Sequence, residues 1–428
     1  KPYKEKVTAK ITADPNLRMK LGVDLNDFIE GALPVDVVYT VQRNGTARAD
    51  IAVDATPALF FVEPFDFAKK PGNKGSAAFT AYLKDGVLQS IKNLTAKGEG
   101  FTLGKSNIAF KQKDGQTSLA NGTFPNFVLE KTTGALEFVF DKDGAANIVI
   151  NSKIFDAQPF MTTKEKKGEY SEPPMKISVN AQTMMTAPDE TVRDVTMFYD
   201  IDGQGRFNRM EMDAKVGAGS LFVRFKPDGE GKRTFRMKSD DAGAMLKAFQ
   251  LYSNIRGGEM VIYGEPIDGV LDRNIKGVAE ITNFKVVDAP ALTKILSVLS
   301  LTGIGDALMG EGLAFDKLEA NFSWLYRKKG SLLVLKEGRT SGNSLGLLFD
   351  GTFDNEKHMV DVSGTVVPMS GLNEIIGAIP LLGDILTGGS GGIFAATYSI
   401  KGSSDAPEIS VNPLSVLTPG IIRRVLFE

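Results

Sequence analysis

The chain has 428 residues, of which 42% are hydrophobic and 24% are charged. Its 50 basic and 52 acidic residues are intermixed and give a net charge of −2, so we expect no basic face and no nucleic-acid partner. The absence of cysteine excludes disulfides and thiolate metal sites.

Alternation of apolar and polar residues is the main pattern along the chain. It is clearest in "RMEMDAKV" (209–216), "LEANFSWLYR" (318–327) and "ATYSIK" (396–401). Successive side chains of a strand point to opposite faces, so this pattern predicts half-buried strands with one apolar face and one face in water. A doubly wound parallel sheet would instead show continuous apolar runs.

Turn signals separate many short strands. Asp-Gly and Asn-Gly pairs recur, and residues 195–239 are typical of four strands joined by three glycine-bearing turns. The whole chain would hold roughly 25–30 strands, whereas open sheets rarely exceed ~10 without curling or splitting. Several sandwiches would fit, but no linker separates them. We therefore predict a mainly β fold: a long, twisted, antiparallel-rich sheet curled into an elongated hydrophobic groove.

A few short helices are expected near the C-terminal part. Residues 239–255 and 287–310 each carry an aspartate, Asp241 or Asp288, that can cap a helix start, and Pro290 suits a first turn. A third helix is predicted within 370–379, before Pro380. No stretch reaches the 18 or so uninterrupted apolar residues of a membrane span.

The C-terminal segments carry a family resemblance. "DDAGAMLKAFQLYSNIRGG", "GDALMGEGLAFDKLEANF" and "VSGTVVPMSGLNEIIGAIPLLGDILTGG" follow one another in order. Residues 230–428 thereby resemble the C-terminal periplasmic region of the AsmA-like family, the group of AsmA, TamB and YhdP, in its alphaproteobacterial form. Residues 1–229 share with the family only the pattern of amphipathic strands, and we expect them to form a β-rich groove segment continuous with that region.

The resemblance implies a bridge-like lipid transfer protein of the Gram-negative envelope. Such proteins carry phospholipids between the inner and the outer membrane along a β-groove, in the periplasm, and are anchored in the inner membrane through an N-terminal helix. This chain lacks that helix, so we expect it to be a periplasmic C-terminal part. No cofactor is implied.

The alternating segments then give the candidate groove lining. We expect acyl chains to follow an apolar track, and a charge introduced by Phe225→Asp or Phe322→Arg to block it without unfolding the sheet. Without the resemblance, an ordinary closed core would explain the same pattern. The track residues are Met210, Met212, Leu221, Val223, Phe225, Leu318, Phe322, Trp324, Tyr326, Tyr398 and Ile400.

The last residues form a second candidate site. After Pro419-Gly420, apolar residues surround two arginines, a combination that suits an anionic membrane surface. A segment that seals the end of the sheet would explain the same residues. The predicted membrane contacts are Ile421, Ile422, Arg423, Arg424, Val425, Leu426 and Phe427.

Two other classes of protein are alternatives to lipid transfer, a scaffold and an enzyme. A periplasmic scaffold or assembly factor would pair exposed sheet edges with strands of an outer-membrane protein partner. An enzyme is not expected, because no G-x-S-x-G motif occurs and the one histidine, His358, has no nucleophile motif beside it.

Overall fold

The computed structural model describes residues 3–20, 26–113, 116–161, 173–267, 274–298, 302–327, 330–368 and 396–412. These residues form 25 strands, of which 22 belong to one large mixed sheet and three to a small second sheet. The predicted mainly β fold, with one large sheet and a few short helices, is confirmed. The chain divides into two compact units after Gly205, whereas the resemblance suggested a division at 229/230.

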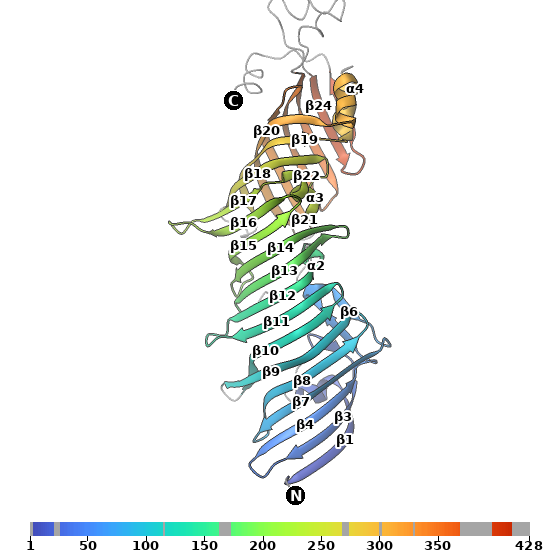
Figure 1. Cartoon of the computed structure of the whole chain (residues 1–428), viewed down its shortest axis with the longest axis vertical. Coiled ribbons are helices and arrows are strands. Elements are labelled where there is room, and N and C mark those ends of the chain that lie inside the picture. The colour runs from blue at the N-terminus through green and yellow to red at the C-terminus, as the bar shows by residue number, and fades with distance from the viewer. Residues whose placement is uncertain are drawn as a thin grey trace, which may run out of the picture. The chain divides into compact units, whose positions relative to one another are not determined.

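The first unit contributes eleven strands to the large sheet, each paired with the next (Figure 1). The pairs are antiparallel except for β12 and β13, which run parallel. In their order of pairing the strands are β1 (Glu5–Ala13), β3 (Leu33–Val41), β4 (Thr46–Asp54), β7 (Gly75–Lys84), β8 (Val87–Gly98), β9 (Phe101–Lys113), β10 (Gln116–Leu129), β11 (Thr132–Phe140), β12 (Ala146–Asp156), β13 (Met175–Ala187) and β14 (Glu190–Ile201).

Short elements cover one end of the apolar face in this unit. They are α1 (Pro15–Lys20), α2 (Gln158–Met161), the 3₁₀ helix η1 (Glu63–Phe65) and the small sheet of β2 (Ile29–Glu30), β5 (Leu59–Val62) and β6 (Phe67–Lys69). Rings of Phe60 and Phe67 pack on Phe101 of β9 with centroids 5.1 and 5.8 Å away. Phe65 packs on Phe155 of β12, 6.3 Å away. These rings fix the small sheet on the large one.

Two buried cations hold the covering loops in place. Arg18 donates to the carbonyls of Ala13, Gly31 and Ile29 at 2.7–3.1 Å. Lys69 Nζ donates to the carbonyls of Ala58, Lys70 and Thr56 at 2.9, 3.0 and 3.4 Å. Burial lowers the pKa of Lys69. Both side chains satisfy loop carbonyls that would otherwise be buried without a donor, so they are structural.

The second unit contributes the other eleven strands, with antiparallel pairs from β15 to β25. The four strands predicted within 195–239 are β14 to β17. The strands are β15 (Phe207–Val216), β16 (Gly219–Pro227), β17 (Arg233–Ser239), β18 (Ile255–Pro266), β19 (Ile275–Val286), β20 (Leu313–Arg327), β21 (Gly330–Ser341), β22 (Leu345–Asp354), β23 (Met359–Pro368), β24 (Ala396–Ser403) and β25 (Glu408–Asn412).

Three helices lie at one end of these strands. Helix α3 (Ala242–Ala248) follows β17, and the Asp241 carboxylate caps it by accepting from the Ala244 N–H at 3.0 Å, as predicted. The second predicted helix is two helices, α4 (Pro290–Val298) and α5 (Thr302–Met309), which join β19 to β20. Pro290 does open α4.

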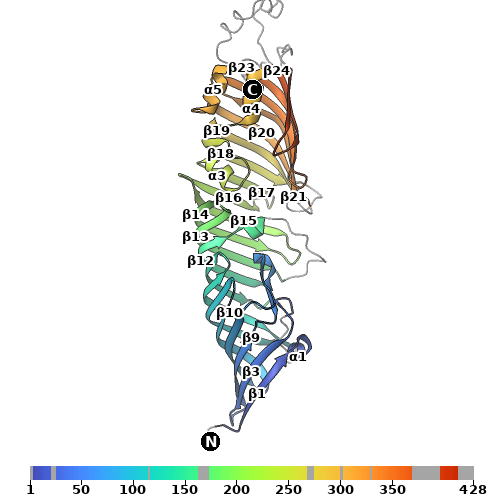
Figure 2. The same cartoon turned by 90° about the vertical axis from the view of Figure 1, so that its right-hand side faces the viewer.

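Helix α4 shows that the sheet of the second unit is curled. The helix follows β19 along the chain, yet it contacts β25, and the strands β20 to β24 lie between those two in the order of pairing. In Figure 2 it lies between the part of the sheet that carries β19 and the part that carries β24. The two parts can both reach one helix only if the sheet bends around it.

Bulges in the strand interiors keep the apolar residues on one face. Asn93, Asp194, Asn283 and Glu337 have φ between 50° and 55°, a left-handed conformation inside a strand. At each, apolar residues or glycine lie three positions apart instead of two, as in Ile281 and Phe284. At Asn93 and Glu337 the register also shifts by one residue, so an extra residue forms a bulge that adds local twist and helps a long sheet to curl.

Two predicted features lie outside the described residues: the helix within 370–379 and the membrane contacts of 421–427. Among the helices that the structure describes, none combines the length and the apolarity needed to cross a membrane.

Candidate functional site

All eleven predicted track residues lie in the second unit on one face of the sheet. The clearest sign is a single row of directly paired residues that crosses every strand from β15 to β25. Each member is apolar or glycine: Met210, Phe225, Phe235, Gly264, Gly277, Phe322, Leu335, Gly351, Val362, Ile400 and Ile409. Trp324 and Tyr326 extend this face towards one end of the strands, and Leu221 and Leu318 towards the other.

Burial changes along this face from one strand end to the other. Near the helices, the face is closed: Leu221, Ile281, Val366 and Ala396 are fully buried. Away from the helices the face is more open, and most apolar side chains there are half-buried, although Met212, Phe225 and Val362 are buried. The half-buried set comprises Met210, Val223, Met237, Ile262, Phe322, Trp324, Leu333, Leu335, Phe349 and Ile400. Tyr326 and Phe353 at its margin are exposed.

Several aromatic rings lie flat over a glycine of the neighbouring strand. A Cβ built on Gly338 would stand 2.2 Å from the Phe349 ring, and one on Gly364 would stand 2.7 Å from the Tyr398 hydroxyl. Tyr398 donates to the Leu348 carbonyl at 3.2 Å, and burial raises its pKa. Glycine opposite an aromatic residue lets the ring cover the backbone. The face is therefore smooth, with few polar atoms along it.

The sequence analysis missed part of this lining. Leu333, Leu335, Phe349 and Phe353 lie on the same face as Trp324, which pairs directly with Leu333. Alternation could not assign these residues to a face, because "SLLVL" and "LGLLF" are apolar at consecutive positions. The signal that could have found them is glycine on the strand opposite an aromatic residue.

The opposite face of the second unit is a network of paired charges. Lys317 Nζ lies 2.7 Å from Glu280 and 2.8 Å from Glu319, and Arg339 lies 3.2 Å from Glu319. Arg327 pairs with Asp354 at 2.8 Å. Pairs of this kind across neighbouring strands contribute little each when exposed, but they mark this side as the one that faces water.

These carboxylates make stability depend on pH. The hydrogen bond that Lys317 donates holds the pKa of Glu319 below its usual 4.5, with Arg339 adding to the effect. A carboxylate whose pKa is lowered by folding stabilises the protein above its unfolded pKa and loses that contribution as the pH falls. We expect the melting temperature to drop below pH 4.5, and Glu319→Gln to weaken this dependence slightly. Circular dichroism melts at a series of pH values test this. An unchanged pH profile in the variant would contradict it.

The first unit has an apolar face of its own, where a row of directly paired residues crosses β10 to β14. It consists of Phe124, Leu136, Ile150, Val179 and Met197.

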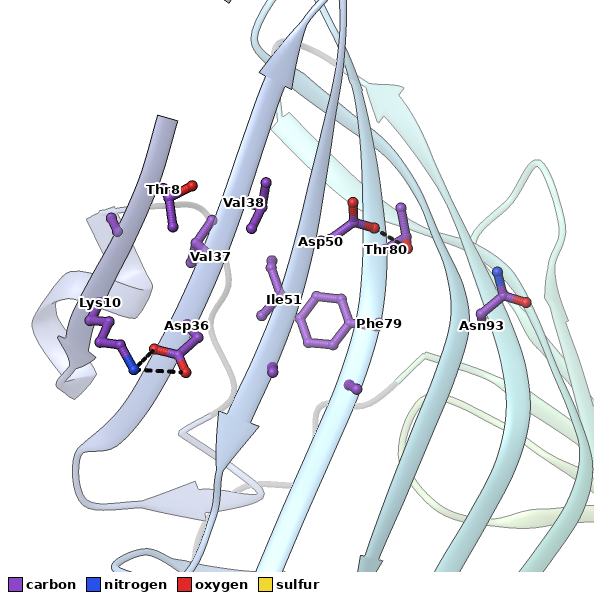
Figure 3. Close-up of a pocket in the computed structure, with 13 residues that line it drawn as sticks. Thr8, Lys10, Asp36, Val37, Val38, Asp50, Ile51, Phe79, Thr80 and Asn93 are labelled. Carbon is purple, nitrogen blue, oxygen red and sulfur yellow. Dashed lines mark hydrogen bonds and ion pairs between the residues drawn. The ribbon is translucent and has the colours of Figure 1, made fainter. Parts of the chain in front are cut away.

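A shallow hollow of about 540 Å³ lies on the polar side of this unit, across β1, β3, β4, β7 and β8 (Figure 3). Small side chains such as Ala52 and Ala78 leave it open. Its charged groups are already paired: Lys10 lies 3.2 Å from Asp36, and Asp50 accepts from Thr80 at 2.8 Å. The Arg48 side chain also donates to Asp50 and is the main cause of its lowered pKa. The hollow thus offers no free acid, base or nucleophile.

Within the described ranges, no group of three or more His, Cys, Asp or Glu side chains could hold a metal ion. Compared with protein-family models, curated proteins and solved structures, the chain matches none of them. The open apolar face is therefore the feature of the described residues that best indicates a function.

Proposed function

We propose that this chain binds phospholipid acyl chains on the open apolar face and carries them along it, as a bridge-like lipid transfer protein of the Gram-negative envelope. The observation that carries the proposal is the row of eleven apolar or glycine positions from Met210 to Ile409, of which nine are half-buried and two are buried. Large exposed apolar patches on a folded protein mark a binding surface.

The chemistry of the face suits lipid tails. Each methylene moved from water to an apolar surface contributes ~0.8 kcal/mol, so a tail is held along its length without any specific polar contact. Because the rings of Phe349 and Tyr398 cover glycine backbone, a tail meets few hydrogen-bonding groups that could stop it. Head groups would remain in water at the open margin. The face needs no catalytic group and no cofactor for this role.

The resemblance of residues 230–428 to the AsmA-like family supports the same role and adds its setting. That setting is the periplasm, with phospholipid moving between the inner and the outer membrane. Both the family and the setting are part of the proposal.

Lipid extraction from the purified full chain tests the proposal. We expect mass spectrometry to find phospholipid in stoichiometric amounts, with species that follow the composition of the host membrane. Protein free of lipid, together with bound strands of an outer-membrane protein, would contradict the proposal and support the assembly-factor alternative.

A further inference from the structure

A rim at the helix end of the second unit combines exposed apolar side chains with cations that pair with no carboxylate of the described residues. After α3 the chain turns at Gln250, whose φ is 54°, and the N–H groups of Leu251 and Tyr252 both bond to the Leu246 carbonyl. Both residues are partly exposed: Leu251 is 50% exposed and Tyr252 is 44% exposed, although burial raises the pKa of the Tyr252 hydroxyl.

Met309 belongs to the same rim, through a chain of hydrogen bonds. Asn254 Nδ2 donates to the carbonyls of Val287 and Asp288 at 3.1 and 2.6 Å, and the Val287 N–H donates back to the Asn254 carbonyl. The Asp288 N–H bonds to the Leu308 carbonyl at 3.3 Å. Met309, the next residue, is 61% exposed.

The rim also carries two cations side by side. Arg256 of β18 pairs directly with Lys285 of β19, and like charges in that position repel each other. The Arg256 guanidinium donates to the carbonyls of Ser253 and Ile255 at 2.7 and 3.2 Å, which places it beside Tyr252. No carboxylate of the described residues lies within ion-pair distance of Arg256 or Lys285, in contrast to the paired charges on the polar face.

We propose that the rim of Leu251, Tyr252, Arg256, Lys285 and Met309 docks on the surface of an anionic phospholipid bilayer. Apolar side chains that enter the interface next to cations that meet phosphates are the combination that such a surface binds. Asp288 and Glu311 lie close by in the sequence and oppose the attraction in part, so docking is reversible. The inference deepens the proposed function, because a bilayer is the source or destination of the lipid that the open face carries.

Flotation of the full chain with vesicles tests the docking. We expect binding to vesicles of phosphatidylcholine mixed with phosphatidylglycerol, little binding to pure phosphatidylcholine, and weaker binding at high salt. Each cation near such a surface strengthens binding about five-fold, so the charge reversal in Arg256→Glu with Lys285→Glu should weaken binding by at least about 25-fold. The matched control is Arg236→Glu with Lys336→Glu, which makes the same charge change on the polar face and should lower it much less. Equal losses in the two pairs would overturn the proposal.

Insertion of the rim is measured separately by fluorescence. In a chain whose single tryptophan is changed by Trp324→Phe, Tyr252→Trp should show a blue shift and quenching by brominated lipid when vesicles are added. Tyr263→Trp, on the polar face, should show neither. If the fluorescence of the Tyr252→Trp variant does not shift when vesicles are added, the proposal that the rim enters the bilayer is wrong. If the unchanged chain co-purifies with lipid but does not dock on vesicles, the rim is refuted alone, whereas docking by a chain that never holds lipid would refute the proposed function.

Discussion

Phe225→Asp is expected to destabilise the second unit by about 3–5 kcal/mol or more. The loss of a buried phenylalanine alone costs about 3–5 kcal/mol, and the burial of a carboxylate adds to it. Phe225 is only 3% exposed. It pairs with Met210 on one side and Phe235 on the other. The sequence analysis expected this variant to stay folded, as part of an open face. The structure corrects that expectation for Phe225, because its side chain is buried between its neighbours.

Phe222→Asp is the matched control for Phe225→Asp. Phe222 lies on the same strand, points to the polar face and is 41% exposed. Its ring lies 6.0 Å from the Arg224 guanidinium, so an aspartate there would have cations within reach. We expect its stability to change by no more than about 0.5 kcal/mol, as for most surface positions. Urea unfolding followed by circular dichroism measures both variants, and equal losses would contradict the assignment of the two faces.

Phe322→Arg is expected to remove lipid binding while the sheet remains folded. Phe322 is half-buried in the middle of the row, above Gly277 and beside Leu335. A guanidinium among acyl chains costs roughly 2.5–3.5 kcal/mol, so bound lipid should fall by about 100-fold. Because the side chain is at the open part of the face, the arginine can reach water in the lipid-free protein. Lipid bound per protein, measured by mass spectrometry, gives the result.

Ser323→Arg is the control for Phe322→Arg. Ser323 is the next residue on β20 and points to the polar face, opposite Lys276. We expect it to leave lipid content and melting temperature unchanged. If Phe322→Arg unfolds the protein, or binds as much lipid as Ser323→Arg does, the open face is not where lipid binds.

The period-two pattern was sufficient to find the main strands and the side of each that is apolar. Met210 and Met212 in β15, Phe322 and Trp324 in β20 and Ile400 in β24 were assigned to one face from alternation alone, and the register confirms that shared face. Alternation works for these strands because one side meets apolar groups and the other carries paired charges. The lipid-binding role that the sequence analysis gave these residues stays a prediction.

Other features could not be predicted from alternation. A bulge such as that at Glu337 changes the spacing to three, and only the register shows which residues remain on one face. The parallel pairing of β12 with β13, the small sheet on β9 and the contact of α4 with β25 are long-range arrangements without a local pattern. Phe225 is buried and Phe322 is half-buried although both alternate in the same way, so the pattern of a single strand does not give the degree of burial.

Photocrosslinking along β20 tests whether lipid tails lie on the open apolar face. A photoreactive amino acid is placed in turn at Asn321, Phe322, Ser323 and Trp324, the chain is irradiated in cells, and lipid adducts are detected by mass spectrometry. We expect adducts at 322 and 324 and none at 321 and 323, because successive side chains of a strand point to opposite faces. Adducts at all four positions, or at none while the protein is folded, would contradict it.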